Sequence, residues 1–356
     1  MTDLLKKCNT PSEYEVMPGT RDPYHWPFAR NSIWNTPIGS DAEYKPAGFQ
    51  PEPAFGIDKE IVYTTDESDE LLEICNSRNG RWPTNEKDIV HTGSYMYWPR
   101  GLIFPATSGN ACCAIIQPDG HTIIQIQPTC RADVNSKHIV GWSRAPVDLL
   151  GEGLYGTHWG SGLSSLGGSI RLGELISDEP LHHALKLNIL AKVYAYIGDE
   201  VPGYRWPADR HDGYATYDRW SPAYYGGTDP ELTMGSLVAI PPEVTPESLK
   251  LRTDLGRKIF HALQDYGAYI VDDSAWESYD LSAEFGVREE VQHAYGIDIG
   301  IGWAHRGCRN ETQWNYYHDL SVMIRALNIV VNSSPDNIGG GGKPRAPLAP
   351  DMVFGG

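Results

Sequence analysis

A glycine-rich stretch at residues 151–175 constrains the fold of this chain more than any other segment. Its sequence, GEGLYGTHWGSGLSSLGGSIRLGEL, holds eight glycines around one histidine, one tryptophan and several hydroxyl side chains. Glycine at this density weakens helices and strands alike, and it serves where the backbone needs positive φ values or must approach another group closely. The stretch therefore predicts an irregular segment that forms part of a binding or catalytic site.

Short apolar alternations bounded by Gly, Pro, Asn and Asp recur along the rest of the chain. This pattern is typical of an antiparallel β-sandwich or jelly roll. The clearest hairpin joins residues 111–116 to residues 121–127 through a Pro-Asp-Gly turn. A second hairpin is expected to join residues 169–176 to residues 181–189. The sequence thus predicts a mainly β fold.

Helices are few and peripheral in this interpretation. Helical spacing of apolar residues is present over 66–78, 251–266 and 315–331, and a strand is expected after Gly267. We expect one catalytic β-sandwich domain with a short segment on either side of it. The predicted boundaries are an N-terminal arm over 1–25, the domain over 26–333, and a Gly/Pro-rich extension over 334–356.

The charge balance limits the partners of the protein. There are 46 acidic and 29 basic residues, which gives a net charge of −17. Such a charge repels nucleic acid and anionic lipid, and it favours neutral or cationic partners. No apolar run is long enough to span a membrane. The N-terminus shows no apolar leader, which fits either an intracellular protein or the mature form of an exported one.

The six cysteines show no CxxC spacing, which argues against a zinc knuckle or a thioredoxin-like site. One alternative is a disulfide from Cys75 or Cys112 to Cys130, and the other is a set of buried thiols. No HExxH motif is present. We therefore predict no metal or other cofactor, with a structural calcium held by loop carboxylates as the alternative.

The second expected hairpin carries a titratable pair. A four-residue turn would place Glu174 directly opposite His183 among apolar neighbours. Burial there would perturb the pKa values of both groups, which is common at functional sites. The alternative is a buried pair that only fixes the strand register.

Aromatic side chains indicate a carbohydrate ligand. The chain has 20 Tyr and 11 Trp but only 7 Phe, a bias toward rings that can lie half exposed and stack on sugars. Residues 203–228 form a long aromatic loop, which we interpret as a cleft wall. Its expected substrate contacts are Arg205, Trp206, Tyr214 and Tyr225.

Further candidate contacts lie at strand positions and in the glycine-rich stretch. Gln125 and Gln127 share the polar face of the first hairpin, which is either a cleft lining or the solvent side. The strand after Gly267 ends in Asp272 and Asp273, and strand ends hold catalytic groups rigidly. Trp276 and Trp159 supply further aromatic rings.

Several segments, taken in order, resemble a family. They are FARNSIWNTPIG (28–39), IRLGEL (170–175), HHALKL (182–187), YRWPA (204–208), LTMGSL (232–237) and ALQDYGAYIVDDSAW (262–276). Together these segments resemble a large family of secreted bacterial proteins associated with carbohydrate-rich environments. The resemblance implies an exported protein, secreted or periplasmic. In that family the position of Gln125 often holds Glu.

The leading hypothesis is a glycoside hydrolase that degrades a polysaccharide or oligosaccharide. Glu174 is the candidate acid, and Asp272 or Asp273 the base or nucleophile. His183 would orient Glu174, and His158, freed by its flanking glycines, would reach the substrate. The rings expected to stack on sugars are Trp159, Trp206 and Trp276.

Two alternatives remain open from the sequence. In a polysaccharide lyase, His158 or a tyrosine would abstract a proton from a uronate, and Arg171 or Arg205 would neutralise its carboxylate. In a carbohydrate-binding protein without catalysis, exposed aromatic rings would be present without a perturbed titratable pair.

Overall fold

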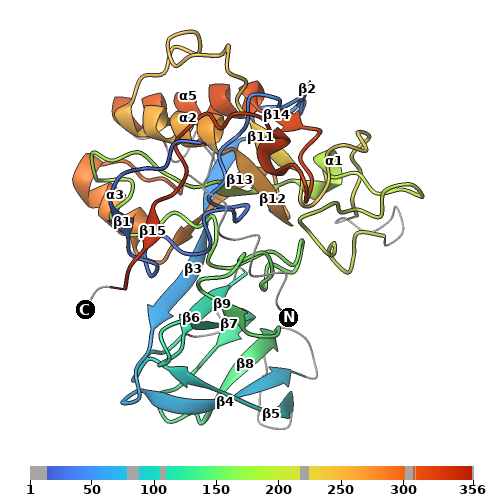
Figure 1. Ribbon diagram of the computed structural model, residues 1–356. Coiled ribbons are helices and arrows are strands. Elements are labelled where there is room, and N and C mark those ends of the chain that lie inside the picture. Colours follow the sequence, from blue (N-terminus) through green and yellow to red (C-terminus); the bar gives the residue numbers. More distant parts are fainter. Residues whose placement is uncertain are drawn as a thin grey trace.

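The computed structural model describes residues 14–77, 88–104, 110–216, 224–300, 308 and 310–354. Strands hold 30% of the residues and helices 14%, which confirms the predicted mainly β, sandwich-like class. Figure 1 shows an upper part, in which helices cover the sheet, and a lower part built from strands. Across the described ranges, no helix combines the length and the apolar character that crossing a bilayer requires.

One large sheet runs through both parts. Its 13 strands follow the order β2-β14-β11-β12-β10-β13-β3-β6-β7-β8-β4-β5, with β9 paired to β7. The strands are β2 (Tyr44–Pro46), β3 (Ala54–Thr64), β4 (Glu70–Ser77), β5 (Ile89–Trp98), β6 (Cys113–Ile116), β7 (Thr122–Cys130), β8 (His138–Ser143), β9 (Val147–Asp148), β10 (Leu185–Ile189), β11 (Leu237–Ala239), β12 (Ala268–Asp273), β13 (Ser278–Glu284) and β14 (Asn328–Val330). The sheet is mixed, because β10·β12, β13·β3, β3·β6 and β4·β8 are parallel pairs.

A separate two-stranded ribbon joins the ends of the described chain. It pairs β1 (Thr20–Arg21) with β15 (Asp351–Met352) in parallel. The Arg21 guanidinium reinforces the ribbon by donating to the carbonyl oxygen of Pro350 at 3.0 Å. Residues of the predicted N-terminal arm therefore lie beside residues of the predicted C-terminal extension.

Strand β3 links the two parts of the sheet, as Figure 1 shows. Its residues 54–60 pair with β13, and its residues 61–64 pair with β6. Side chains alternate along a strand, so Asp58 and Glu60 point to the same face of the sheet. Two carboxylates on one face of a central strand need polar partners, because burying an unpaired charge is costly.

Helices in the described ranges are α1 (Ala191–Tyr194), α2 (Asp254–Asp265), α3 (Val287–Tyr295) and α5 (Glu311–Ala326), with a 3-10 helix η3 (Ile338–Gly340). The helix predicted over 251–266 is confirmed by α2. The one predicted over 315–331 is confirmed in its first part by α5, and its end forms β14. Both long helices contribute to one apolar cluster with the sheet, through residues such as Phe260 and Met323.

The helix predicted over 66–78 is wrong, since most of these residues form β4. Leu72 and Ile74 are both buried, and they share an apolar cluster with Met96 and Trp98 of β5. A spacing of two between buried residues is that of a strand, not of a helix. Cross-strand packing therefore decides the conformation of this segment.

The first predicted hairpin is confirmed and the second is wrong. Strands β6 and β7 pair in antiparallel fashion, with Ile116 opposite Ile123. Residues 169–184 form turns instead of a strand, and β10 pairs with β12 and β13. The reason is that the N–H of Ile170 donates to the carbonyl oxygen of Ser282 on β13, which replaces the expected partner.

The cysteines of the described ranges are buried. Cys112 and Cys113 are free thiols at the start of β6, with no exposed surface. The alternative of a disulfide from Cys112 to Cys130 is therefore wrong, and for Cys112 the alternative of a buried thiol is confirmed.

Candidate functional site

A cavity of about 930 Å³ opens where the two parts of the sheet meet. Its walls come from β3, β7, β8, β10, β12 and β13, and from residues 212–214 of the predicted aromatic loop. The sheet order β12-β10-β13-β3 brings together side chains that lie far apart in the sequence.

Five aspartates line this cavity: Asp58 on β3, Asp212 in the loop, Asp272 and Asp273 at the end of β12, and Asp280 on β13. Among the described lining residues, Arg288 is the one with a cationic side chain. Its guanidinium is already held by the carboxylate of Asp298, with two hydrogen bonds of 2.6 and 2.7 Å. The cavity is therefore acidic.

Two glycines make room for these carboxylates. A Cβ atom on Gly56 would lie 1.8 Å from Oδ1 of Asp280, and one on Gly160 would lie 2.5 Å from Oδ1 of Asp272. Neither distance leaves space for a side chain. The close approach predicted for the glycine-rich stretch is thus present at Gly160, where the neighbour is Asp272.

Asp58 and Asp272 are held by the same amide group. Asn110 donates to Oδ2 of Asp58 at 3.1 Å and to Oδ2 of Asp272 at 3.0 Å. Asn188 on β10 also donates to Oδ2 of Asp58, at 3.1 Å. Its own Oδ1 is buried, with no hydrogen-bond partner in the described part of the chain. One acceptor at the cavity wall is therefore left without a donor.

Tyrosines hold two of the other aspartates. The Tyr214 hydroxyl donates to Oδ2 of Asp273 at 2.9 Å, and the Tyr225 hydroxyl donates to Oδ2 of Asp212 at 2.8 Å. Oδ1 of Asp273 also accepts from two backbone N–H groups, at 2.9 and 3.0 Å. Asp273 is therefore tied to the surrounding backbone, whereas the carboxyl group of Asp212 interacts with the hydroxyl groups of Tyr225 and Tyr214.

Burial raises the pKa values of four of the five aspartates. Desolvation, with the charge of Asp272, raises the pKa of Asp212 to about 8. Desolvation, with the charge of Asp58, raises the pKa of Asp280 to about 7. The pKa values of Asp58 and Asp273 are raised as well, mainly by desolvation. At neutral pH the cavity therefore contains at least one aspartic acid that keeps its proton.

A buried ionic cluster lies behind Asp272. His158 Nε2 donates to Oε1 of Glu60 at 2.5 Å, and the Lys186 ammonium donates to the same oxygen at 2.6 Å. His158 Nδ1 faces Oδ2 of Asp272 at 3.6 Å. Desolvation opposes ionisation of Glu60, but Lys186 and His158 outweigh it and hold the pKa of Glu60 below its usual range. Glu60 is therefore a carboxylate.

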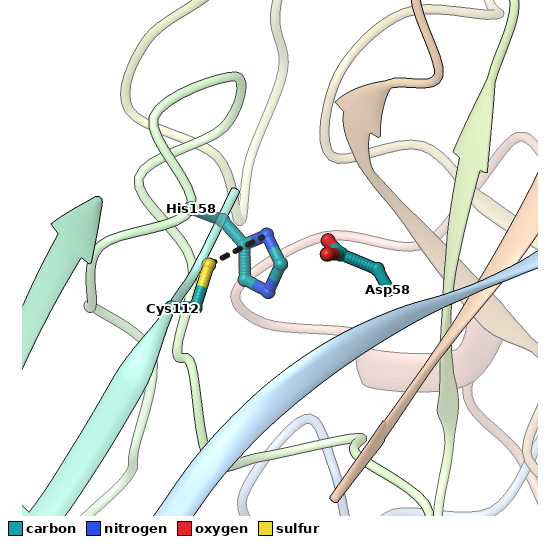
Figure 2. Close-up of side chains that lie close together, drawn as sticks. All are labelled: Asp58, Cys112 and His158. Carbon is teal, nitrogen blue, oxygen red and sulfur yellow. Dashed lines mark hydrogen bonds between the residues drawn. The ribbon is translucent and has the colours of Figure 1, made fainter. Parts of the chain in front are cut away.

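Cys112 approaches the His158 ring at Nδ1, the nitrogen that is not bonded to Glu60. Its Sγ is 3.9 Å from His158 Nδ1, and Figure 2 shows the Asp58 carboxylate pointing toward the same imidazole. One ligand atom from each of these three residues lies within 4.8 Å of the other two, so the group can hold a metal ion. Burial raises the pKa of the Cys112 thiol to about 12.

Aromatic rings form the walls of the cavity. Trp276 is 58% exposed and Trp142, on β8, is 36% exposed. Gln127 positions a third indole, because its Oε1 accepts from the Trp159 backbone N–H at 3.0 Å and its carbonyl oxygen accepts from Trp159 Nε1 at 2.7 Å. Trp142 packs edge-on against Trp159, with the ring centroids 6.3 Å apart. Flat apolar surfaces are thus presented beside the aspartates.

The structure brings many of the predicted site residues together. Those that line the cavity are Gln127, Trp159, Tyr214, Asp272, Asp273 and Trp276. His158 is fully buried and contacts the cavity through Asp272, and Tyr225 does so through Asp212. The flanking glycines therefore do not give His158 the open position that was predicted.

Glu174 and His183 lie together but away from the cavity. Their side chains are 3.2 Å apart, through turns instead of the expected hairpin, and neither lines the cavity. Desolvation would raise the pKa of Glu174, yet His183 outweighs it and lowers that pKa. The direction is opposite to the one that a general acid needs, so the structure lends no support to the predicted role of Glu174.

The remaining predicted contacts also lie outside the cavity lining. Arg171 and Arg205 each form an ion pair with a glutamate. Gln125 donates to one backbone carbonyl group and accepts from one backbone N–H group. Trp206 packs against the apolar core. These side chains have structural partners where the sequence predicted a ligand.

Sequence reasoning missed five Asp and Asn residues that line the cavity: Asp58, Asn110, Asn188, Asp212 and Asp280. For Asp58 a signal was present, since β3 reads AFGIDKEIVYT and carries three consecutive charged residues inside an otherwise apolar strand. Asp212 lies within the predicted loop 203–228, of which residues 217–223 are outside the described ranges. Asp280 and Asn188 depend on sheet register, which no local pattern reveals.

Comparisons of the chain with protein-family models, with curated proteins and with solved structures gave no match. The function must therefore be inferred from the site.

Proposed function

We propose that this protein is a glycoside hydrolase that cleaves a neutral or amino-substituted polysaccharide or oligosaccharide. The observation that carries the proposal is the grouping of five aspartates, of which Asp212 has its pKa raised to about 8, in an open cavity walled by aromatic rings. Glycoside hydrolysis needs one carboxylic acid and one carboxylate at the scissile bond. A polysaccharide substrate agrees with the exported location that the family resemblance implies.

Asp212 is the proposed general acid. Its pKa of about 8 keeps it protonated at neutral pH, and it lines the cavity. Asp272 is the proposed base or nucleophile. It accepts hydrogen bonds from Asn110 and from the N–H of Asp273, which suits a carboxylate. The charge of Asp272 helps to keep Asp212 protonated, so the two groups complement each other.

The reaction then balances as follows. Asp212 gives its proton to the glycosidic oxygen as the bond from that oxygen to the anomeric carbon breaks. Asp272 either takes a proton from the attacking water or forms a covalent intermediate that water hydrolyses in a second step. One water is consumed, and the two sugar fragments carry its hydrogen and hydroxyl.

Indole rings support a sugar ligand. The exposed faces of Trp142 and Trp276 lie along the cavity, and the C–H faces of sugar rings stack on such surfaces. Trp159 is held in place by Gln127, and the Arg210 guanidinium lies over its ring at 4.6 Å from the centroid, so this indole is fixed before any ligand arrives. Fixed surfaces lower the entropy cost of binding.

The lyase alternative is less well supported. A uronate needs a cation beside its carboxylate, but Arg171 and Arg205 are paired elsewhere and Arg288 is held by Asp298. Five aspartates at the cavity would repel an acidic polymer. A binding protein without catalysis would have no use for a carboxyl group that keeps its proton at neutral pH, as that of Asp212 does.

A panel of neutral, amino-substituted and uronate-containing polysaccharides tests the proposal. We expect the purified protein to release reducing ends from a neutral or amino-substituted glycan without ultraviolet absorption from an unsaturated sugar. Ultraviolet-absorbing products from a uronate polymer would favour the lyase instead. Binding to glycans without any release of reducing ends would favour the non-catalytic alternative.

A further inference from the structure

The buried imidazole of His158 is oriented as in a metal ligand. Nε2 of His158 lies 2.5 Å from Oε1 of Glu60 and 3.2 Å from the Lys186 ammonium, and the shorter contact, to a carboxylate that can only accept, places a hydrogen on Nε2. The other ring nitrogen, Nδ1, faces Cys112 Sγ at 3.9 Å, and the Asp58 carboxylate points toward the ring (Figure 2). A carboxylate that fixes one ring nitrogen while the other binds the ion is the usual arrangement around metal-bound histidines.

The carboxyl groups around this imidazole outnumber the cationic side chains that contact them. Asp58, Glu60 and Asp272 surround it, and in the described part of the chain the cationic groups that contact these three carboxyl groups are the Lys186 ammonium and the His158 ring itself. Lys186 is fully buried, and it donates to Glu60 and to a backbone carbonyl group. Buried carboxylates are normally paired or bound to a metal, and a divalent ion would supply the missing positive charge.

Asn188 gives an independent observation. The residue is 2% exposed, and its amide nitrogen holds Asp58. Its Oδ1 has no hydrogen-bond partner in the described ranges, although it is buried at the wall of the cavity. Buried acceptors without a donor are rare, because they lose the hydrogen bond that water would give. A metal-bound water beside Asp58 would supply that donor.

We propose that Asp58, Cys112 and His158 bind one divalent transition-metal ion of the zinc type at the floor of the cavity. Oxygen, thiolate sulfur and imidazole nitrogen are ligands that zinc accepts together. A zinc ion about 2.3 Å from sulfur and about 2.0 Å from nitrogen sets those two atoms roughly 3.5 Å apart, close to the separation present. Binding displaces two protons, the thiol proton of Cys112 and the Nδ1 proton of His158, and both are released to solvent.

Three protein ligands leave a fourth position for water on the cavity side, because Asp58 lines the cavity. The centre does not depend on the proposed hydrolysis, since Asp212 and Asp272 are not among its ligands. Its test therefore measures metal binding directly and needs no substrate.

Cobalt(II) is the probe, because it replaces zinc and its absorption reports the ligands. A second group of zinc-type side chains, Glu73, Cys75 and His91, lies elsewhere in the sheet, so all proteins carry His91→Ala to remove it. The full-length chain is freed of metal with a chelator and titrated with cobalt. We expect one equivalent to bind, with the near-ultraviolet band of a thiolate-to-cobalt charge transfer.

Cys112→Ala and Cys113→Ala form a matched pair, since both thiols are fully buried and adjacent. We expect Cys112→Ala to lose the thiolate band and to weaken cobalt binding by about tenfold or more, on the scale seen when ligand shells are altered. Cys113→Ala should keep both the thiolate band and the affinity for cobalt. Absence of the band and of stoichiometric binding in the His91→Ala protein, or equal behaviour of the two cysteine variants, would overturn the proposal.

A second pair covers the case in which Cys112→Ala does not fold. Asp58→Asn and Asp280→Asn each change one cavity aspartate on neighbouring strands. Asp58→Asn should weaken cobalt binding and shift the absorption, and Asp280→Asn should not. Equal affinities in these two variants would contradict the ligand assignment whatever happens at Cys112.

Discussion

At the scale of single residues, the site depends on differences among chemically identical side chains. Asp272 and Asp273 are neighbours at the end of β12, yet Asp273 is bonded to two backbone N–H groups and to Tyr214. Asp272 instead faces Asn110 and the His158 ring. These surroundings assign a structural role to Asp273 and leave Asp272 as the candidate catalytic residue. The sequence alone, in which the two aspartates are adjacent, could not distinguish these roles.

Asp212→Asn should remove the alkaline limb of the curve of rate against pH. A general acid works while it keeps its proton, so the rate of the wild-type protein should fall as pH rises through about 8, the pKa of Asp212. In the variant we expect this limb to disappear and turnover to fall by roughly 10² to 10⁴. The measurement is kcat against pH for both proteins. An unchanged alkaline limb in folded Asp212→Asn would remove Asp212 from the mechanism.

Asp280→Asn should change how stability depends on pH. The folded pKa of Asp280 is raised from 3.8 to about 7, so the folded state binds more protons than the unfolded state between these values. Stability contributed by the neutral carboxyl is therefore full at low pH and is lost as pH rises through that window. Between about pH 5 and pH 7, the metal-free wild type should lose roughly 2 to 3 kcal/mol more than the variant.

Denaturant unfolding at several pH values measures this difference. The asparagine amide cannot titrate, and it keeps an oxygen acceptor for the Ser278 hydroxyl, which lies 3.2 Å from Asp280 Oδ1. Parallel stability curves for the two proteins would show that Asp280 titrates normally.

At the scale of elements, local patterns predicted some parts of the site and not others. The strand β12 follows a helix and a glycine and ends in two aspartates, so Asp272 and Asp273 were visible in the sequence. Asp58 and Asp280 lie on β3 and β13, whose parallel pairing joins segments more than two hundred residues apart. Long-range register of this kind depends on tertiary packing, which local propensity does not encode.

The two failed elements have the same cause. Apolar residues of 66–78 fit a helix in isolation, but they pack across strands instead. Residues 169–184 fit a hairpin in isolation, but their backbone bonds to β13 and to the carbonyl oxygen of Trp34. In both cases a distant partner satisfied the backbone or the core better than the local one.

Gly56→Ala should destabilise the contact between β3 and β13. The new Cβ would lie 1.8 Å from Asp280 Oδ1, so the strand or the carboxylate must move. We expect a loss of about 1 to 3 kcal/mol or more in the free energy of unfolding, as in other overpacked cores. Gly213→Ala is the control, because its Cβ would meet no atom within 4 Å. Similar urea midpoints for both variants would show that the sheet tolerates the added atom.

At the scale of the whole molecule, the cavity exists because one sheet continues through two differently covered parts. Strand β3 supplies Asp58 at the junction, β8 supplies Trp142, β7 supplies the Gln127 that holds Trp159, and β12 and β13 supply further aspartates. The recurring apolar alternations had predicted the class of fold, and the aromatic bias had predicted the sugar ligand that we propose. Neither could locate the junction, since it results from the order of strands in the sheet.

The net charge predicts how binding responds to salt. With −17 overall and an acidic cavity, the protein should bind neutral glycans without a large electrostatic contribution. We expect KM for a neutral substrate to change by less than about twofold between low and high salt, because screening has little to act on. Steady-state kinetics at several salt concentrations measure this. A KM that falls steeply with added salt would indicate an acidic substrate, whose repulsion salt screens.

The most direct measurement is kcat/KM for Asp272→Asn beside Glu174→Gln, on whichever glycan the wild-type protein cleaves. Asp272 lines the cavity, and Glu174 is a partly buried carboxyl with its own histidine outside it. We predict a fall of roughly 10² to 10⁴ for Asp272→Asn and less than about fivefold for Glu174→Gln, with both proteins folded. Wild-type rates in Asp272→Asn, together with loss of activity in Glu174→Gln, would contradict the proposed site.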